Sequence, residues 1–260
     1  MTIRRVFMTC AVVFAAGCGT APALKEPPAA TDQALSERIL SRYPSDQEKF
    51  AIYAVPDSFF GVSTSSRGSV AAGLLLGPLG VAGNVAYVRS ESERQMVPVK
   101  ALLAEDLRKT LATQAPNAAA EAGALPARHY ALVPSATVEF RSDDEFRLRC
   151  NLSVALMDGG NEVWRARYLM QADGAFMHAR SEDMAKATSE LGTCLGRAYA
   201  LFQSHKANRL GGFKEHEVVA EYTMHLQVLE SALPERIIAA DPLGLFEWRK
   251  SDVKSFKPRQ

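Results

Sequence analysis

The sequence has little that would mark an enzyme, a metalloprotein or a nucleic-acid-binding protein. Lys and Arg number 30 against 29 Asp and Glu, a net charge of +1, which lacks the basic surplus of a nucleic-acid-binding surface. The five histidines show neither His-x-x-x-His nor His-Glu-x-x-His spacing, so they predict no metal site. The chain has neither a Gly-x-Ser-x-Gly motif nor a Walker loop. We therefore expect no catalytic residues, no metal, no cofactor and no nucleic-acid partner.

Cysteine is also scarce, with four in 260 residues. Cys10 and Cys18 lie close to the N-terminus, and Cys150 and Cys194 lie in the body of the chain. Cys150 falls on the apolar face of a predicted strand and Cys194 on the apolar stripe of a predicted helix. A helix packed on the sheet would bring these faces together, so the pair is a candidate disulfide, with two buried free thiols as the alternative. Inward placement and the lack of a Cys-x-x-Cys motif argue against a reactive thiol.

The N-terminus carries an export signal. Arg4 and Arg5 precede an apolar run at residues 6–14, which is too short to span a bilayer as a stable anchor. Small residues follow the run and end at a cysteine. This stretch resembles the lipobox of bacterial lipoprotein precursors, and its residues are Ala15, Ala16, Gly17 and Cys18.

The resemblance implies that residues 1–17 are removed and that Cys18 carries diacylglycerol and a third, amide-linked chain. Gly19 rather than Asp follows the cysteine, which favours the outer membrane and a body that faces the periplasm. Each buried methylene would contribute about 0.8 kcal/mol to anchoring in membrane lipid. Ordinary secretion with cleavage nearby is the alternative. Without Arg4 and Arg5 the mature chain has 28 basic against 29 acidic residues, a net charge of −1.

The rest of the chain divides into an N-terminal tether at residues 18–46 and a single α+β periplasmic domain at residues 47–260. Residues 19–31 are rich in Pro and Ala and predict a flexible linker that holds the body off the membrane. Residues 32–43 predict a short helix, because their apolar residues would share one side of it.

The clearest periodicity lies in the middle of the chain. Apolar and polar residues alternate over residues 132–140, 146–156 and 164–171, and a period of two with one polar face is typical of antiparallel strands. Turn-forming residues at 142–144 and 158–161 separate the three runs. The middle of the chain therefore predicts a three-stranded meander.

The flanking segments predict further elements. Residues 50–60 are typical of a first strand, whereas residues 99–114 and 181–208 carry the apolar spacing of amphipathic helices. Residues 216–229 fit both a strand and a helix, and their composition favours the helix. Residues 237–256 predict two short strands joined by a turn.

An uncharged, glycine-rich stretch occupies residues 68–88. Gly77 precedes a proline, which interrupts any straight helix, so a single membrane span is not expected here. The stretch is either a buried connector over the sheet or a segment that contacts the membrane or a partner subunit. The candidate contact residues are Gly73, Leu75, Gly77, Leu79 and Val81.

Together these features predict an α+β fold: an antiparallel meander sheet packed against one long and one shorter amphipathic helix, with a glycine-rich apolar insert. The order of elements resembles small α/β outer-membrane lipoproteins such as the curli-type secretion lipoprotein, in which an insert near the first strand contributes to a membrane barrel. The insert here lacks the alternating pattern of a barrel strand, so no functional residues are carried over.

The predicted function is that of a non-enzymatic lipoprotein, an accessory or assembly subunit of a cell-envelope complex. It would have membrane lipid and an envelope protein as partners, and it could form a homo-oligomer. Two alternatives stay open. One is a carrier of a small ligand or lipid, with an apolar pocket between the long helix and the sheet. The other is an envelope enzyme of a class that the sequence does not name.

Overall fold

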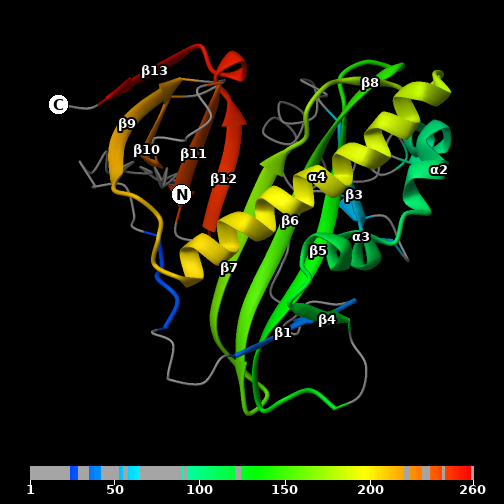
Figure 1. Ribbon diagram of the computed structural model, residues 1–260. Helices are drawn as coiled ribbons and strands as arrows, with labels where there is room; N and C mark the ends of the chain where they lie inside the picture. The colour runs from blue at the N-terminus through cyan, green and yellow to red at the C-terminus, as the bar shows by residue number, and fades with distance from the viewer. Residues whose placement is uncertain are drawn as a thin grey trace, which may run out of the picture.

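A computed structural model describes most of the chain from residue 93 onward and shorter pieces before it. The described residues are 24–28, 35–41, 53–54, 58–64, 90, 93–120, 124–219, 223–229, 235–241 and 244–258. Figure 1 shows a β-sheet crossed diagonally by a long helix, α4 (Ser181–Lys206). Two shorter helices, α2 (Lys100–Leu103) and α3 (Leu107–Gln114), lie beside it.

The sheet is mixed, with parallel and antiparallel neighbours. Its strands follow the order β13-β9-β10-β11-β12-β7-β6-β5-β1-β4, and β2, β3 and β8 attach beside that path. The strands are β1 (Ser36–Ile39), β2 (Tyr53–Ala54), β3 (Phe60–Thr64), β4 (Ala118–Ala120), β5 (Arg128–Phe140), β6 (Glu145–Asp158), β7 (Asn161–Gln171), β8 (Phe176–Met177), β9 (Phe213–Val219), β10 (Thr223–Leu229), β11 (Arg236–Asp241), β12 (Gly244–Arg249) and β13 (Ser255–Pro258).

The predicted three-stranded meander is confirmed at the centre of the sheet. β5, β6 and β7 pair in antiparallel order, and the alternate apolar residues of β6 are fully buried. The turn between β6 and β7 has two glycines with positive φ, Gly159 at 56° and Gly160 at 85°. A two-residue hairpin turn needs this left-handed backbone, which glycine adopts without steric strain.

The fold class predicted from the sequence is wrong, because an antiparallel meander accounts only for the centre of the sheet. β1 pairs in parallel with both β4 and β5, β3 pairs in parallel with β5, and β12 pairs in parallel with β7. The molecule is therefore a large mixed sheet rather than a meander with two helices. Alternation identifies a half-buried strand, but it does not identify the neighbour or its direction.

Two predicted helices are strands. The described part of residues 32–43 forms β1, and residues 216–229 contribute to the hairpin of β9 and β10. Val218 and Val228 are buried in that hairpin. Burial against neighbouring strands outweighs the weak helical preference of the local composition, because the difference in propensity is well below about 1 kcal/mol for most residues.

The predicted helix at residues 99–114 is divided. Its first turn, α2, ends at Leu103, and α3 begins after Asp106. The Asp106 carboxylate accepts a hydrogen bond from the Arg108 backbone N–H at 3.1 Å, which caps α3. The same carboxylate accepts from the Arg108 guanidinium, and that side-chain hydrogen bond lowers the pKa of Asp106.

The long helix is confirmed, and the structure pairs the two body cysteines. α4 buries an apolar stripe against the sheet, and it contacts β6 and β7. Cys150 on β6 and Cys194 on α4 form a disulfide, with their Cα atoms 5.9 Å apart. Both residues are fully buried. The bond therefore fastens the helix to the middle of the sheet.

The C-terminal strands form a unit with a hydrophobic cluster of its own. β9 to β12 run antiparallel in sequence order, and β13 returns to pair with β9. The buried members of this cluster are Val218, Val228, Ile237 and Ala239. The unit joins the centre where β12 pairs with β7. Gly244 sits at this joint with φ 154°, and a Cβ there would collide with the Arg167 backbone.

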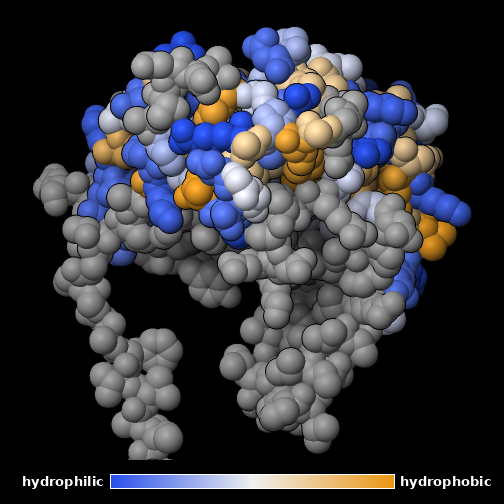
Figure 2. Space-filling model, turned by 90° about the horizontal axis from the view of Figure 1, so that it is seen from below, coloured by the Kyte–Doolittle hydropathy of each residue, from blue (hydrophilic) through white to orange (hydrophobic). Residues whose placement is uncertain are grey.

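Within the described parts of the chain, no helix is both long and apolar enough to cross a membrane. Figure 2 shows the molecule from below, where apolar side chains form small groups among hydrophilic ones over the coloured residues.

Candidate docking site for the N-terminal segment

The described piece of the N-terminal tether, residues 24–28, lies against the C-terminal end of α4 and against β7 (Figure 1, lower left). Leu24 packs on the main hydrophobic core. The indole Nε1 of Trp164 donates a hydrogen bond to the Lys25 carbonyl oxygen at 3.0 Å. The Glu26 carboxylate lies 3.4 Å from His205 Nε2. Part of the linker predicted at residues 19–31 is thus held on the body rather than free.

Aromatic side chains form the floor of this docking site. Alternation along β7 places Trp164 and Tyr168 on one face of the sheet, and the helical spacing of α4 places Phe202 and His205 over them. The Trp164 and His205 rings meet edge to face with centroids 5.8 Å apart. Tyr130 of β5 contacts the Trp164 and Phe202 rings in the same manner. The floor is therefore built from three elements, β5, β7 and α4, all of which the sequence predicts.

His205 is the polar group at the centre of the site. The Tyr168 hydroxyl lies 2.8 Å from its Nδ1, and only 1% of the residue is exposed. Burial lowers the pKa of His205, and the nearby Glu26 carboxylate opposes that effect in part. Burial also raises the pKa of Tyr168 well above its ordinary value. Because the neutral imidazole is favoured, the contact between Glu26 and His205 is weaker than an ion pair at neutral pH.

A second polar contact ties β1 to the same half of α4. The buried Glu37 carboxylate accepts hydrogen bonds from the Tyr199 hydroxyl at 2.7 Å, Gln203 Nε2 at 2.8 Å and Lys206 Nζ at 2.6 Å. The Lys206 ammonium also lies 5.0 Å from the centre of the Tyr130 ring. Burial raises the pKa of Tyr199, as does its hydrogen bond to Glu37. Residues 24–28 and β1 thus both contact the last turns of α4.

A cluster of charged side chains joins the C-terminal unit to the centre of the molecule. The buried Arg236 of β11 pairs with Glu247 of β12 and with Asp173, which follows β7. Arg197 of α4 and Arg249 of β12 reach the same acids, at 3.3 Å from Glu247 and 2.9 Å from Asp173. A buried charge is tolerated when it is paired and hydrogen-bonded. Each acid of this cluster faces at least two guanidinium groups, so the cluster holds β11, β12 and α4 together.

The structure describes only two of the site residues predicted from the sequence. Cys150 and Cys194 lie together in the core, as the candidate disulfide requires. The other predicted site residues lie outside the described residues. These are Ala15, Ala16, Gly17 and Cys18 of the lipobox and Gly73, Leu75, Gly77, Leu79 and Val81 of the insert.

Sequence reasoning missed the docking site. Trp164 and His205 lie on the inward faces of confirmed elements, which could have drawn attention to them. Their partner segment has no periodicity from which an attachment could be predicted. Among the described residues, no group of three His, Cys, Asp or Glu side chains could hold a metal ion.

No protein-family model matches this chain, and no curated protein sequence matches it. A function for this protein is therefore proposed from its residues and their geometry.

Proposed function

We propose that this protein is a non-enzymatic lipoprotein anchored in the outer membrane through Cys18, and that its body serves as an accessory or assembly subunit of a cell-envelope complex. One observation carries the proposal. Residues 24–28, which begin six residues after the lipobox cysteine, are seated on the aromatic site between α4 and β7. A short chain fixed to the body at one end and to lipid at the other is suited to hold that body at a membrane surface.

The use of the buried charged groups supports a structural role. Glu37 fastens β1 to α4, and Arg236 with Glu247 fastens the C-terminal unit. These groups are engaged with one another rather than directed toward a substrate. The carrier hypothesis needs a pocket between α4 and the sheet, where Leu152 and Leu195 are fully buried in one core. This packing favours the subunit hypothesis over the carrier hypothesis. Extraction of the purified body followed by mass spectrometry would reveal a carried ligand.

Lipidation is tested by metabolic labelling with radioactive palmitate, followed by separation of membrane and soluble fractions. We expect label on the wild-type protein, and its loss with accumulation of the uncleaved precursor in Cys18→Ser. Cys10→Ser is the matched control and should be labelled as the wild type is. Label that persists in Cys18→Ser, or that is absent from the wild type, would refute the anchor.

The subunit role is tested by gentle detergent extraction and identification of co-purifying proteins. We propose that the insert contacts the partner, so Gly77→Asp and Leu75→Asp should reduce recovery of the complex. Formation of the Cys150–Cys194 disulfide reports that these variants still fold. If both variants recover the same partners in wild-type amounts, the insert is not the contact.

A further inference from the structure

We propose that the docked segment orients the body on the membrane, with the C-terminal end of α4 toward the lipid headgroups and its N-terminal end away from them. The proposal rests on the proposed function, because it needs lipid at Cys18. It adds a defined membrane-facing surface, formed by residues 24–28 and the last turn of α4. The partner of that surface is the headgroup layer itself.

The length of chain between the lipid and the docking site limits how far this surface can lie from the membrane. Leu24 follows Cys18 by six residues, and an extended chain spans at most about 3.3–3.6 Å per residue, or about 20 Å in all. A linker free as far as Leu35 would span about 55 Å and would allow any orientation. Docking therefore shortens the free part of the tether from about 55 Å to about 20 Å.

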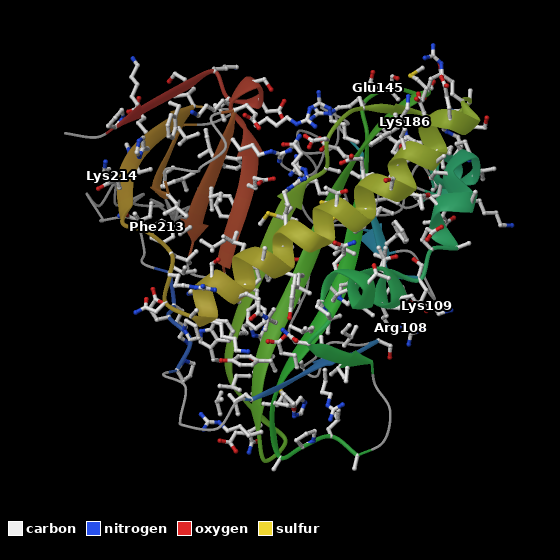
Figure 3. All side chains as sticks on the ribbon, in the orientation of Figure 1. Arg108, Lys109, Glu145, Lys186, Phe213 and Lys214 are labelled. Atoms are coloured by element: carbon white, nitrogen blue, oxygen red, sulfur yellow. A yellow bond between two sulfur atoms is a disulfide. The ribbon has the colours of Figure 1, made fainter. Side chains whose placement is uncertain are left out.

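The body is longer than the tether, so the tether restricts which end of the body can lie near the membrane. α4 has 26 residues, which at about 1.5 Å per residue is about 38 Å, nearly twice the reach of the tether. The docked segment contacts His205 in the last turn of the helix and Trp164 beneath it. Figure 3 places Lys186 and Glu145 at the opposite end of α4, and Phe213 and Lys214 beyond its C-terminal end. The tether thus keeps the C-terminal end of α4 close to the membrane and leaves the N-terminal end far from it.

The charges at the two ends of α4 favour the same orientation on an anionic surface. Lys25 and Arg209 are exposed at the docked end, next to the last turn with Lys206. The first turn of α4 carries two acids, Glu182 and Asp183, of which Asp183 lies 3.7 Å from the Lys186 ammonium. Cations near an anionic leaflet contribute favourably to binding, whereas acidic groups are repelled. Two acids lie at the docked end: Glu26 contacts His205, and the buried Glu37 pairs with Lys206, so the exposed cations that face the lipid are Lys25 and Arg209.

The orientation is tested with nitroxide labels on the full-length lipidated protein in phosphatidylethanolamine–phosphatidylglycerol vesicles that carry a gadolinium headgroup lipid. Labels are attached through Arg209→Cys, three residues past the end of α4, or through Lys186→Cys, which about 30 Å of helix separates from Lys206. Because relaxation enhancement falls steeply with distance, we expect it to be at least about tenfold larger at position 209 than at position 186. Equal enhancement, or more at position 186, overturns the orientation.

Two insertions of equal length show whether the docked segment is the cause. Ten Gly and Ser residues placed between Thr20 and Ala21 lengthen the chain before the docked segment, and the difference between the two labels should disappear. The same ten residues between Ala30 and Thr31 lengthen the chain after it, and the difference should remain. Equal effects of the two insertions overturn the proposal.

The same vesicles separate this inference from the proposed function. A protein that floats with the vesicles and carries palmitate, but shows no difference between the labels, is a lipoprotein without a fixed orientation. A protein that carries no lipid and does not float overturns the lipoprotein function and the orientation with it.

Discussion

Removal of the Cys150–Cys194 disulfide should cost a substantial part of the free energy of unfolding of this protein. The two cysteines have a sequence separation of 44, and closing a loop of that length in the unfolded chain corresponds to about 4 kcal/mol in the chain-entropy account. For a chain of this size, about 1 kcal/mol shifts the melting temperature by about 2–4 °C, so a loss of about 8–16 °C is expected. Typical domains have only about 5–15 kcal/mol of total stability.

The assay is thermal unfolding of the body from residue 24 onward, with the double variant Cys150→Ala/Cys194→Ala beside the wild type. Reductant distinguishes the cross-link from lost packing, because it should lower the melting temperature of the wild type and leave that of the double variant unchanged. A difference below about 1 kcal/mol between oxidised and reduced wild type, against the roughly 2–4 kcal/mol typical of native disulfides, would refute the reasoning. Titration of free thiols in the unfolded, unreduced protein would then show whether the bond forms at all.

Three further predictions concern the joints around the core. Gly244→Ala should destabilise the protein by more than about 1 kcal/mol, because its backbone has φ 154° and leaves no space for a Cβ, whereas Gly212→Ala meets nothing within 4 Å and should be nearly neutral in chemical denaturation. Glu37→Ala should cost about 2 kcal/mol in the same assay, because it leaves the partly exposed Lys206 ammonium and the Tyr199 and Gln203 donors without their shared acceptor. The pKa of His205 is lowered from 6.5 in the folded state, so the free energy of unfolding should fall as the pH drops through 6.5 toward the folded-state pKa. His205→Gln should flatten that pH dependence, and a change at the exposed His225 should not.

The elements that the sequence predicts correctly are those whose signal is local. Alternation predicts β5, β6 and β7, and the helical stripe predicts α4. Burial alternates along β7 and the first half of β6, whereas the second half of β6 is buried on both faces. The inward faces of Cys150 and Cys194 follow from these patterns, which do not decide between a disulfide and two buried free thiols; the structure pairs the two cysteines. The turn at Gly159 and Gly160 is predictable because the backbone there requires residues that tolerate positive φ.

The errors arise where a distant partner decides the structure. β1 has four residues and gains its strand conformation from parallel neighbours on both sides. The hairpin of β9 and β10 has no preference strong enough to exclude a helix until Val218 and Val228 meet in its core. The attachment of Glu26 to His205 joins segments 179 residues apart in the sequence (205 − 26), and nothing in the segment around Glu26 predicts it.

The parallel pairings on either side of the meander have a consequence for how the chain folds. Ser36 pairs with His129 and Gly244 with Arg167, and the two members of each pair lie far apart in the sequence. The meander pairs, in contrast, form across short turns. Because distant contacts close large loops before they gain any stabilisation, they form late and slowly. We expect the meander and α4 to constitute the folding nucleus, and the N-terminal strands and the C-terminal unit to join it afterwards from opposite sides.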